Sequence, residues 1–259
     1  MAPRITVVRH AEGSHNVLAS RGGFNISDPY LTSLGLMQCA NLQNANIPDM
    51  NPVNTIITSP SKRAIQTALL CTDPSYFRTN GGRLYLTSAL REANPTHKCN
   101  QSSTVEQLEA EFGTLLSIIG QEEYEECWGS ARDATEMRPE ELTNRGLRVR
   151  VAIQNTCTDN PQHPNMHVVV VTHGEFIPYL TGDYSLPRFW LNADCRTYEF
   201  VDPTYTDANA TWRETQESQL RRNAGYTDDV TNAHLKKLLD RHRTNDYNAS
   251  TAENKSTLF

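Results

Sequence analysis

The chain has 259 residues and a formal net charge of −6 at pH 7, so we expect one large domain, or one domain with insertions, around a substantial core. The acidic balance argues against a general affinity for nucleic acid or for a membrane surface, and no apolar run reaches the length of a membrane span. Only eight residues precede Arg9, and they include a predicted strand. We therefore expect no cleaved leader and a cytoplasmic location.

The six cysteines are widely scattered, and none belongs to a C-x-x-C pair. This spacing argues against a zinc site and against a thioredoxin-like redox motif. We expect reduced, mostly packed thiols, and neither a metal nor another cofactor.

The first predicted strand covers residues 5–8, which are β-branched throughout and mostly apolar. Such a run is typical of a buried strand in a parallel sheet. It leads directly into Arg9 and His10. Because ligands bind outside the carboxyl ends of the strands in open parallel sheets, both side chains are expected at a site.

Residues 17–30 are predicted to form a loop that leaves this site. Thr32 or Ser33 can cap a helix that ends at about Gln43. The helical spacing predicts which residues of this helix face the core: Leu34, Met37 and Leu42, with Ala40 as a further candidate.

A second strand is predicted over residues 53–58, and Ser59-Pro60 ends it. Ser61 begins a helix with Arg63 in its first turn, where the positive helix end adds to the attraction for an anion. A third strand over 83–87 leads to Leu90-Arg91-Glu92. Residues 93–145 then form a mostly helical insertion, in which 105–116 has helical spacing.

A helix over 143–156 precedes a second Val-rich strand, His167 to Thr172, which ends on His173 and Gly174. One histidine after a strand is usually a packed imidazole, but two Val-rich strands that both end in histidine favour a site. A short helix over 176–181 and a final strand over 197–201 follow. Beyond Asp202 the chain becomes polar.

Four motifs resemble, in the same order, those of the histidine phosphatase superfamily (phosphoglycerate mutase-like). They are Arg9-His10-Ala11-Glu12 with Asn16, the segment Ser59 to Ala68, Leu90-Arg91-Glu92, and Thr172-His173-Gly174. The family usually has Gly at the position of Ala11. Residues 99–103 resemble a loop of fungal-type relatives, which implies that branch.

The resemblance implies a three-layer α/β/α sandwich with a mainly parallel central sheet and the helical insertion at 93–145. It places a histidine phosphatase-like catalytic domain at residues 1–225. The remaining polar tail, 226–259, is expected to be partly helical, over 229–242, or disordered, over 244–259.

The resemblance also assigns the site. Phosphoryl transfer needs an in-line nucleophile and cations on the equatorial oxygens, and a neutral imidazole can form a covalent intermediate. By resemblance, His10 is the nucleophile, and the phosphate pocket consists of Arg9, Asn16, Arg63 and His173. The two arginines suit bidentate phosphate contacts, and His173 would add positive charge if protonated.

Glu92 corresponds to the proton donor of the family, a role that needs a raised pKa. Outside the resemblance, Glu92 could be a surface salt-bridge partner and Arg63 an exposed helix residue. Glu175 stands beside Gly174 where many relatives carry a small residue, so its carboxylate would repel highly anionic substrates or hold a cationic one. His15 is interpreted as local structure.

Three functions stay open. The first is a phosphomonoesterase that hydrolyses a small-molecule phosphate ester through a phosphohistidine. The second is a phosphoglycerate mutase, but the basic segment that follows the Glu motif in that subfamily does not match residues 93–100. The third is a pseudoenzyme, or a pocket reused for a phosphate-free reaction in specialised metabolism, which Ala11 and Glu175 keep open. The substrate and the oligomeric state are not specified.

Overall fold

The computed structural model describes residues 2–44, 53–78, 81–119, 138–160, 163–184 and 190–226. The chain divides into two compact units, Met1–Thr215 and Gln216–Phe259. Helix α9 (Gln216–Tyr226) is the described part of the second unit. The features below all belong to the first unit.

Within the described residues, the first unit is built on one mixed sheet of seven strands in the order β4-β3-β2-β5-β1-β6-β7. Strands β1, β5, β2, β3 and β4 run parallel, and β6 and β7 are antiparallel to their neighbours. The strands are β1 (Arg4–Arg9), β2 (Thr55–Thr58), β3 (Leu84–Leu86), β4 (Leu116–Ile118), β5 (His167–Thr172), β6 (Cys195–Phe200) and β7 (Trp212–Glu214). The mainly parallel α/β sheet confirms the expected fold class.

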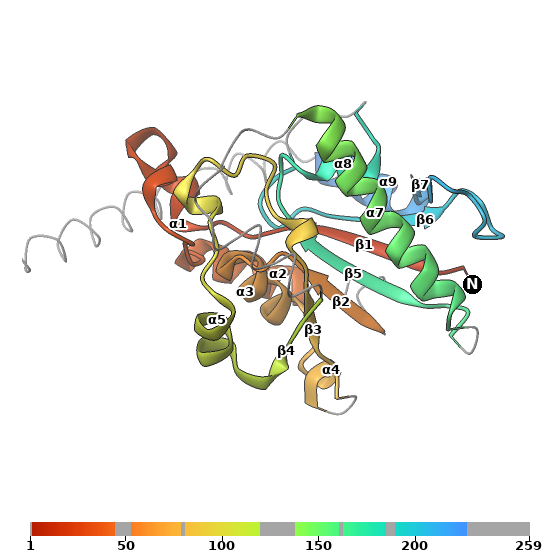
Figure 1. Ribbon diagram of the computed structural model, residues 1–259, viewed down its shortest axis with the longest axis horizontal. Coiled ribbons are helices and arrows are strands. Elements are labelled where there is room, and N and C mark those ends of the chain that lie inside the picture. Colours follow the sequence, from red (N-terminus) through yellow and green to blue (C-terminus); the bar gives the residue numbers. More distant parts are fainter. Residues whose placement is uncertain are drawn as a thin grey trace, which may run out of the picture. The chain divides into compact units, whose positions relative to one another are not determined.

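The helices connect these strands and cover the sheet. They are α1 (Ser14–Val17), α2 (Ser33–Asn44), α3 (Lys62–Cys71), α4 (Pro74–Arg78), α5 (Val105–Phe112), α7 (Pro139–Thr158) and α8 (Ile177–Thr181). Short 3-10 turns occur at Ala19–Arg21, Gly23–Asn25, Ser88–Leu90, Lys98–Asn100 and Gly113–Leu115. Figure 1 shows the long helix α7 running along β1 and β5.

The Val-rich strand β5 lies at the centre of the sheet and is buried along its whole length. Because side chains alternate between the faces of a strand, Val168 and Val170 pack in a cluster with residues of α7 and α8. Val169 and Val171 pack on the other face with residues of α2, α3 and α5. Burial on both faces explains why the strand has no polar alternation.

Helix α2 has the predicted extent but a different buried face. Leu34 and Leu42 are buried as expected, whereas Met37 is 49% exposed and Ala40 is also exposed, and Cys39 is buried instead. The reason is Gly35, at which any Cβ would overlap the carbonyl oxygen of Glu12. This close approach turns the helix toward its glycine side, away from Met37.

The insertion differs more from its prediction. Helix α5 ends at Phe112, because Gly113 has φ +70° and its main-chain N–H closes the last turn. Residues 116–118 then form β4, which pairs with β3 at the sheet edge, so the prediction of a helix up to residue 116 was wrong. Residues 120–137 lie outside the described residues.

The second helix of this region, α7, begins at Pro139, four residues before the predicted start, with proline in its first turn. Strand β7 and helix α4 were not predicted. The tail segments 229–242 and 244–259 lie outside the described residues. In the part of the chain that is described, no helix has both the length and the apolar content required to cross a bilayer.

Candidate active site

The carboxyl ends of three neighbouring strands meet at one edge of the sheet. Beyond the strands, the ladder continues with a 2.9 Å bond from the N–H of His10 to the carbonyl of Thr172. The N–H of Ser59 donates to the carbonyl of Val171 at 3.0 Å. These bonds bring the residues that follow β1, β2 and β5 together.

His10 is buried, and its two ring nitrogens have different partners. Nδ1 lies 2.8 Å from the carbonyl oxygen of Ala11, which can only accept, so Nδ1 carries the proton. Nε2 is therefore unprotonated, and Nε of Arg63 donates to it at 3.3 Å. Burial lowers the pKa of His10 well below its usual value, with Arg63, His173 and Arg9 adding to the effect. The imidazole is neutral.

Arg63 is fully buried, which excludes the interpretation as an exposed helix residue. Its Nη1 donates to the carbonyl of Cys99 at 2.6 Å, and its Nη2 donates to Oδ1 of Asn100 at 3.0 Å. Nη2 also lies 3.0 Å from Nδ1 of His173. The guanidinium is thus held from several sides before any ligand arrives.

His173 lies edge-on to His10, with 5.0 Å between the ring centroids. Because Arg63 donates to its Nδ1, the proton is on Nε2, which lies 2.8 Å from Oγ of Ser59 and 3.3 Å from Oγ of Ser61. Burial, followed by Arg63, lowers the pKa of His173 well below its usual value. His173 is therefore a neutral donor here, not the additional positive charge considered from the sequence.

Arg9 and Gly174 lie against each other at the end of β1. Nη1 of Arg9 donates to the carbonyl of Trp190, and its buried Nε has no hydrogen-bond partner among the described residues. A Cβ at position 174 would lie 3.1 Å from that Nε. Glycine therefore leaves the space that the guanidinium of Arg9 occupies.

The amide of Asn16 is oriented by its oxygen. Oδ1 accepts from the N–H of Gly13 at 3.0 Å and from Nδ2 of Asn192 at 3.4 Å. Nδ2 of Asn192 also donates to the carbonyl of His10 at 3.1 Å. Asn192 was missed from the sequence because it belongs to no motif.

Glu92 is partly buried, and its Oε1 accepts from the N–H of Ala93 at 2.8 Å. Burial, and then the charge of Glu175, raise its pKa to about 7, against the opposing effects of Ala93, Arg63 and Arg9. Glu175 itself is exposed. The raised pKa is what a proton donor requires.

Arg145, from α7, fixes the main chain at this point. It is buried, its guanidinium lies 3.9 Å from the ring centre of Phe176, and its Nη2 donates to the carbonyls of Arg91 at 2.8 Å and Glu92 at 3.4 Å. No pattern in the sequence pointed to Arg145, since a lone arginine in a helix is usually exposed.

A model of the histidine phosphatase superfamily (branch 1) matches residues 5–191. The chain belongs to this superfamily. The assignment makes it a phosphoric monoester hydrolase of the histidine phosphatase type. A comparison with curated protein sequences gave no match.

Solved structures share the histidine phosphatase fold. The chain resembles the ecdysone phosphate phosphatase of Bombyx mori in complex with tungstate, with a TM-score of 0.53 and 13% identity over 83% of this chain and 92% of that one. It also resembles a structure described as mycobacterial hydrolase 1, with a TM-score of 0.51 and 20% identity over 83% of this chain and 97% of that one. At these identities the likeness concerns the fold.

Ala11 departs from the usual glycine of this superfamily without disturbing the site. It is fully buried, and its N–H donates to Oγ1 of Thr67 at 3.0 Å. Glu12 is also buried and accepts a 3.0 Å bond from Oγ1 of Thr32. These two motif residues therefore pack and hydrogen-bond behind the nucleophile.

His15 lies closer to the site than its interpretation as local structure suggested. Its ring centroid is 5.6 Å from that of His10, and its buried Nδ1 has no hydrogen-bond partner among the described residues. Burial, then Arg63 and Arg9, lower its pKa to about 2. Within the described residues, no group of three His, Cys, Asp or Glu side chains is arranged to hold a metal ion.

Proposed function

We propose that this protein hydrolyses a small-molecule phosphate ester through a phosphohistidine on Nε2 of His10. The observation that carries the proposal is the protonation pattern of His10. Its Nδ1–H donates to a main-chain carbonyl, and its unprotonated Nε2 accepts a 3.3 Å hydrogen bond from Nε of Arg63. A neutral nucleophile beside cations suits attack on a phosphate dianion.

In the first step Nε2 of His10 forms a bond to phosphorus and the bond from phosphorus to the ester oxygen breaks. Glu92 transfers its proton to the departing oxygen. In the second step water attacks phosphorus, the P–N bond breaks, and Glu92 takes the proton from the water. A carboxyl group with a pKa of about 7 is suited to both transfers near neutral pH.

The phosphate oxygens would be bound by Arg9, Arg63, Asn16 and His173. The two guanidinium groups carry the positive charge, because both histidines of the site are neutral. Asn16 contributes uncharged N–H donors. The N–H of neutral His173 faces the serine hydroxyls, so a hydrogen bond from His173 to the phosphate would require a second proton, on Nδ1. Gly174 leaves room for Arg9, and the exposed Glu175 lies where its charge acts on Glu92 and Arg9.

The substrate we propose is a phosphorylated small molecule that carries little further negative charge. Glu175 supports this, since a second acidic group on the substrate would approach its exposed carboxylate. Closer kinship with fungal-type relatives, suggested by residues 99–103, is part of the same proposal. The proposal also includes that the protein acts in the cytoplasm and that it has neither nucleic acid nor a membrane as a partner.

The test is a panel of phosphate esters at mildly acidic and neutral pH, with release of inorganic phosphate as the readout. The His10→Ala variant is run beside His163→Ala, a matched control at an exposed histidine outside the site. We expect the wild type and His163→Ala to release phosphate and His10→Ala to release none. Phosphate transfer between two positions of phosphoglycerate would favour a mutase. A lack of activity on every ester would favour the phosphate-free alternative.

A further inference from the structure

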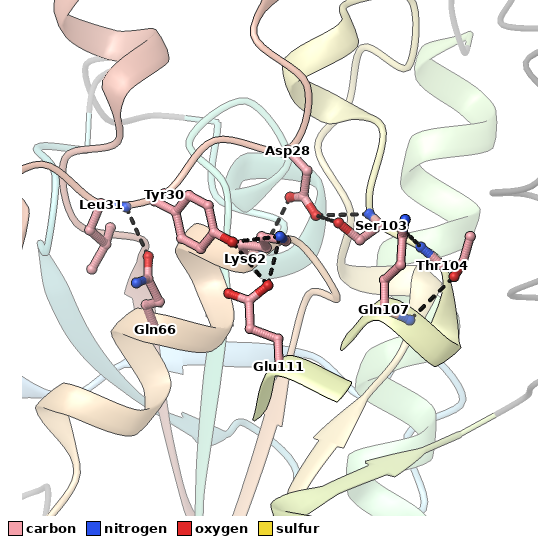
Figure 2. A network of polar contacts seen from close by, with 9 residues as sticks. All are labelled: Asp28, Tyr30, Leu31, Lys62, Gln66, Ser103, Thr104, Gln107 and Glu111. Carbon is pink, nitrogen blue, oxygen red and sulfur yellow. Dashed lines mark hydrogen bonds and ion pairs between the residues drawn. The ribbon is translucent and has the colours of Figure 1, made fainter. Parts of the chain in front are cut away.

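Asp28 is a buried carboxylate that joins two segments distant from it in the sequence. Its Oδ1 accepts the N–H of Lys62 at 2.9 Å, and its Oδ2 accepts the N–H and the hydroxyl of Ser103 at 2.8 and 2.9 Å (Figure 2). Its side chain is buried, and its backbone adopts φ +40°. A buried non-glycine residue with positive φ, whose carboxylate accepts three hydrogen bonds, is a feature that the surrounding structure must maintain.

One of these segments is the start of helix α3, which lacks a local side-chain cap. The N-cap residue Ser61 makes no capping hydrogen bond, and its hydroxyl faces Ser59 and His173 instead. The N–H groups of a first helical turn need acceptors from elsewhere. Asp28 supplies one for Lys62, and its negative charge is favourable at the positive end of the helix.

The other segment carries the acceptors of Arg63. Lys62 precedes Arg63 in the first turn of α3, while Ser103 follows the loop in which Cys99 and Asn100 accept the two outer nitrogens of the Arg63 guanidinium. Asp28 therefore fixes the main chain from which the Arg63 side chain starts and the loop at which it ends. Asp28, the start of α3, the Arg63 guanidinium and the loop of residues 99–103 are thus joined by a continuous series of contacts, which we call the Asp28 network.

We propose that Asp28 is a positioning residue that holds the guanidinium of Arg63 between the nucleophile and the phosphate. The inference rests on the proposed function, because it treats Arg63 as a phosphate ligand. Among the described residues, the Asp28 side chain bonds to Lys62 and Ser103 and not to His10 or His173, so we expect its effect on the reaction to pass through Arg63.

A neighbouring cluster provides the matched control. The side chain of Lys62 forms an ion pair of 2.7 Å with Glu111, and the hydroxyl of Tyr30 donates to Glu111 at 2.9 Å (Figure 2). These contacts tie the same parts of the chain together, but they lie on the surface and involve neither the main chain of α3 nor Ser103. Glu111→Gln therefore weakens the contacts of Lys62 and Tyr30 with α5 and leaves the Asp28 network intact.

The experiment measures kcat/KM for 4-nitrophenyl phosphate with full-length Asp28→Asn, Glu111→Gln, Arg63→Ala and the double variant Asp28→Asn/Arg63→Ala. In Asp28→Asn the amide NH₂ group takes the place of Oδ2, which accepts the N–H and the hydroxyl of Ser103 in the wild type. Donors then face donors, and these hydrogen bonds are lost. We expect Asp28→Asn to lower kcat/KM by about tenfold or more, since a small displacement of a positioning group costs that much. Glu111→Gln should stay within about twofold of the wild type, as is usual for a surface ion pair.

The double variant separates positioning from general stability. If Asp28 acts through Arg63, Asp28→Asn should cause almost no further loss in the Arg63→Ala background. Losses that multiply, or an Asp28→Asn variant equal to Glu111→Gln, would overturn the proposal. Should Asp28→Asn fail to fold, Ser103→Ala serves in its place. It removes one of the three bonds, and it should show a smaller loss that also vanishes without Arg63.

Titration calorimetry with inorganic phosphate keeps this inference separate from the proposed function. Wild type that binds phosphate but hydrolyses no ester would refute the proposed function. The Asp28 proposal would then be judged on phosphate affinity, which must fall in Asp28→Asn and not in Glu111→Gln. Unchanged phosphate affinity in Asp28→Asn would refute the positioning role.

Discussion

Nε of Arg63 donates a 3.3 Å hydrogen bond to Nε2 of His10. The bond keeps that ring nitrogen unprotonated in the resting site and places the positive charge beside it. A phosphate that entered the site would meet both groups, and its oxygens would compete with Nε2 for the Arg63 donor. The same contact therefore protects the nucleophile from protonation and marks where the phosphorus should arrive.

The first prediction concerns the ring nitrogen that is phosphorylated. Rapid-quench labelling with a phosphate-labelled substrate should give an acid-labile label on the peptide that contains His10. Phosphorus NMR of the trapped protein should assign it to Nε2, because Nδ1 is bound to the carbonyl of Ala11. A label on another histidine, or on Nδ1, would contradict the mechanism.

The second prediction concerns Glu92. Glu92→Gln should slow hydrolysis of alkyl phosphates by about a hundredfold to ten-thousandfold, the usual value of general acid catalysis. It should slow aryl phosphates much less, because a good leaving group departs without a proton. Equal losses on both ester types would exclude Glu92 as the proton donor.

For the wild type, the pH profile follows from the same carboxyl group. Its pKa is raised to about 7, so the protonated, donating form is lost as pH rises through 7. We expect kcat for an alkyl phosphate to fall above that pH, and the corresponding limb to disappear in Glu92→Gln.

The third prediction concerns Glu175, whose charge helps to raise the pKa of Glu92. Glu175→Gln should lower that pKa and move the alkaline limb to lower pH. Glu175→Gly should lower KM for a carboxylate-bearing phosphate by about threefold to tenfold, a modest effect because solvent screens an exposed charge. A neutral alkyl phosphate serves as the control. If both substrates respond alike, the carboxylate lies outside the field of the pocket.

The fourth prediction compares two glycines. Gly174→Ala should raise KM by about tenfold, since a new Cβ 3.1 Å from Nε of Arg9 displaces a phosphate ligand and overpacking costs on the order of 1 to 3 kcal/mol. Gly146→Ala, whose Cβ would overlap the carbonyl oxygen of Tyr179, should lower the free energy of unfolding and leave KM unchanged. Thermal unfolding measures the stability of both variants, and steady-state kinetics measures their KM. A stability loss without a change in KM for Gly174→Ala would refute this role.

The fifth prediction concerns domain organisation. We propose that residues 1–225 form the catalytic domain and that 226–259 is a polar tail. The last part of this tail, residues 244–259, has few large apolar side chains and is the part we expect to be dispensable. Truncation after Arg243 should leave the melting temperature and activity nearly unchanged. A large fall in the melting temperature would show that the tail stabilises the enzyme.

Local patterns in the sequence predicted much of the fold, and with the family resemblance they supplied most residues of the candidate site. The Val-rich run of β5, the β-branched run of β1 and the proline before α3 were recognised because strand burial and helix starts depend on neighbouring residues. The histidines and arginines that follow these strands were located in the same way. Strand β4 was missed because three residues at a sheet edge have no periodicity of their own.

The buried face of α2 could not be predicted from the local sequence pattern. Helical spacing predicted Met37 inside, but the close approach of Gly35 to the carbonyl of Glu12 decided the rotation of the helix. Nothing near residue 35 in the sequence indicates that a carbonyl from residue 12 lies against it.

The sequence by itself determined which segments form the main strands and that His10, Arg63 and His173 are candidate site residues. Only the tertiary structure decided their protonation and their supports. Arg63, 53 positions after His10 in the chain, fixes the tautomers of His10 and His173, and Asp28 caps a helix that begins 34 positions later. Burial and hydrogen bonds set these properties, and both depend on atoms that the chain brings together only when it folds.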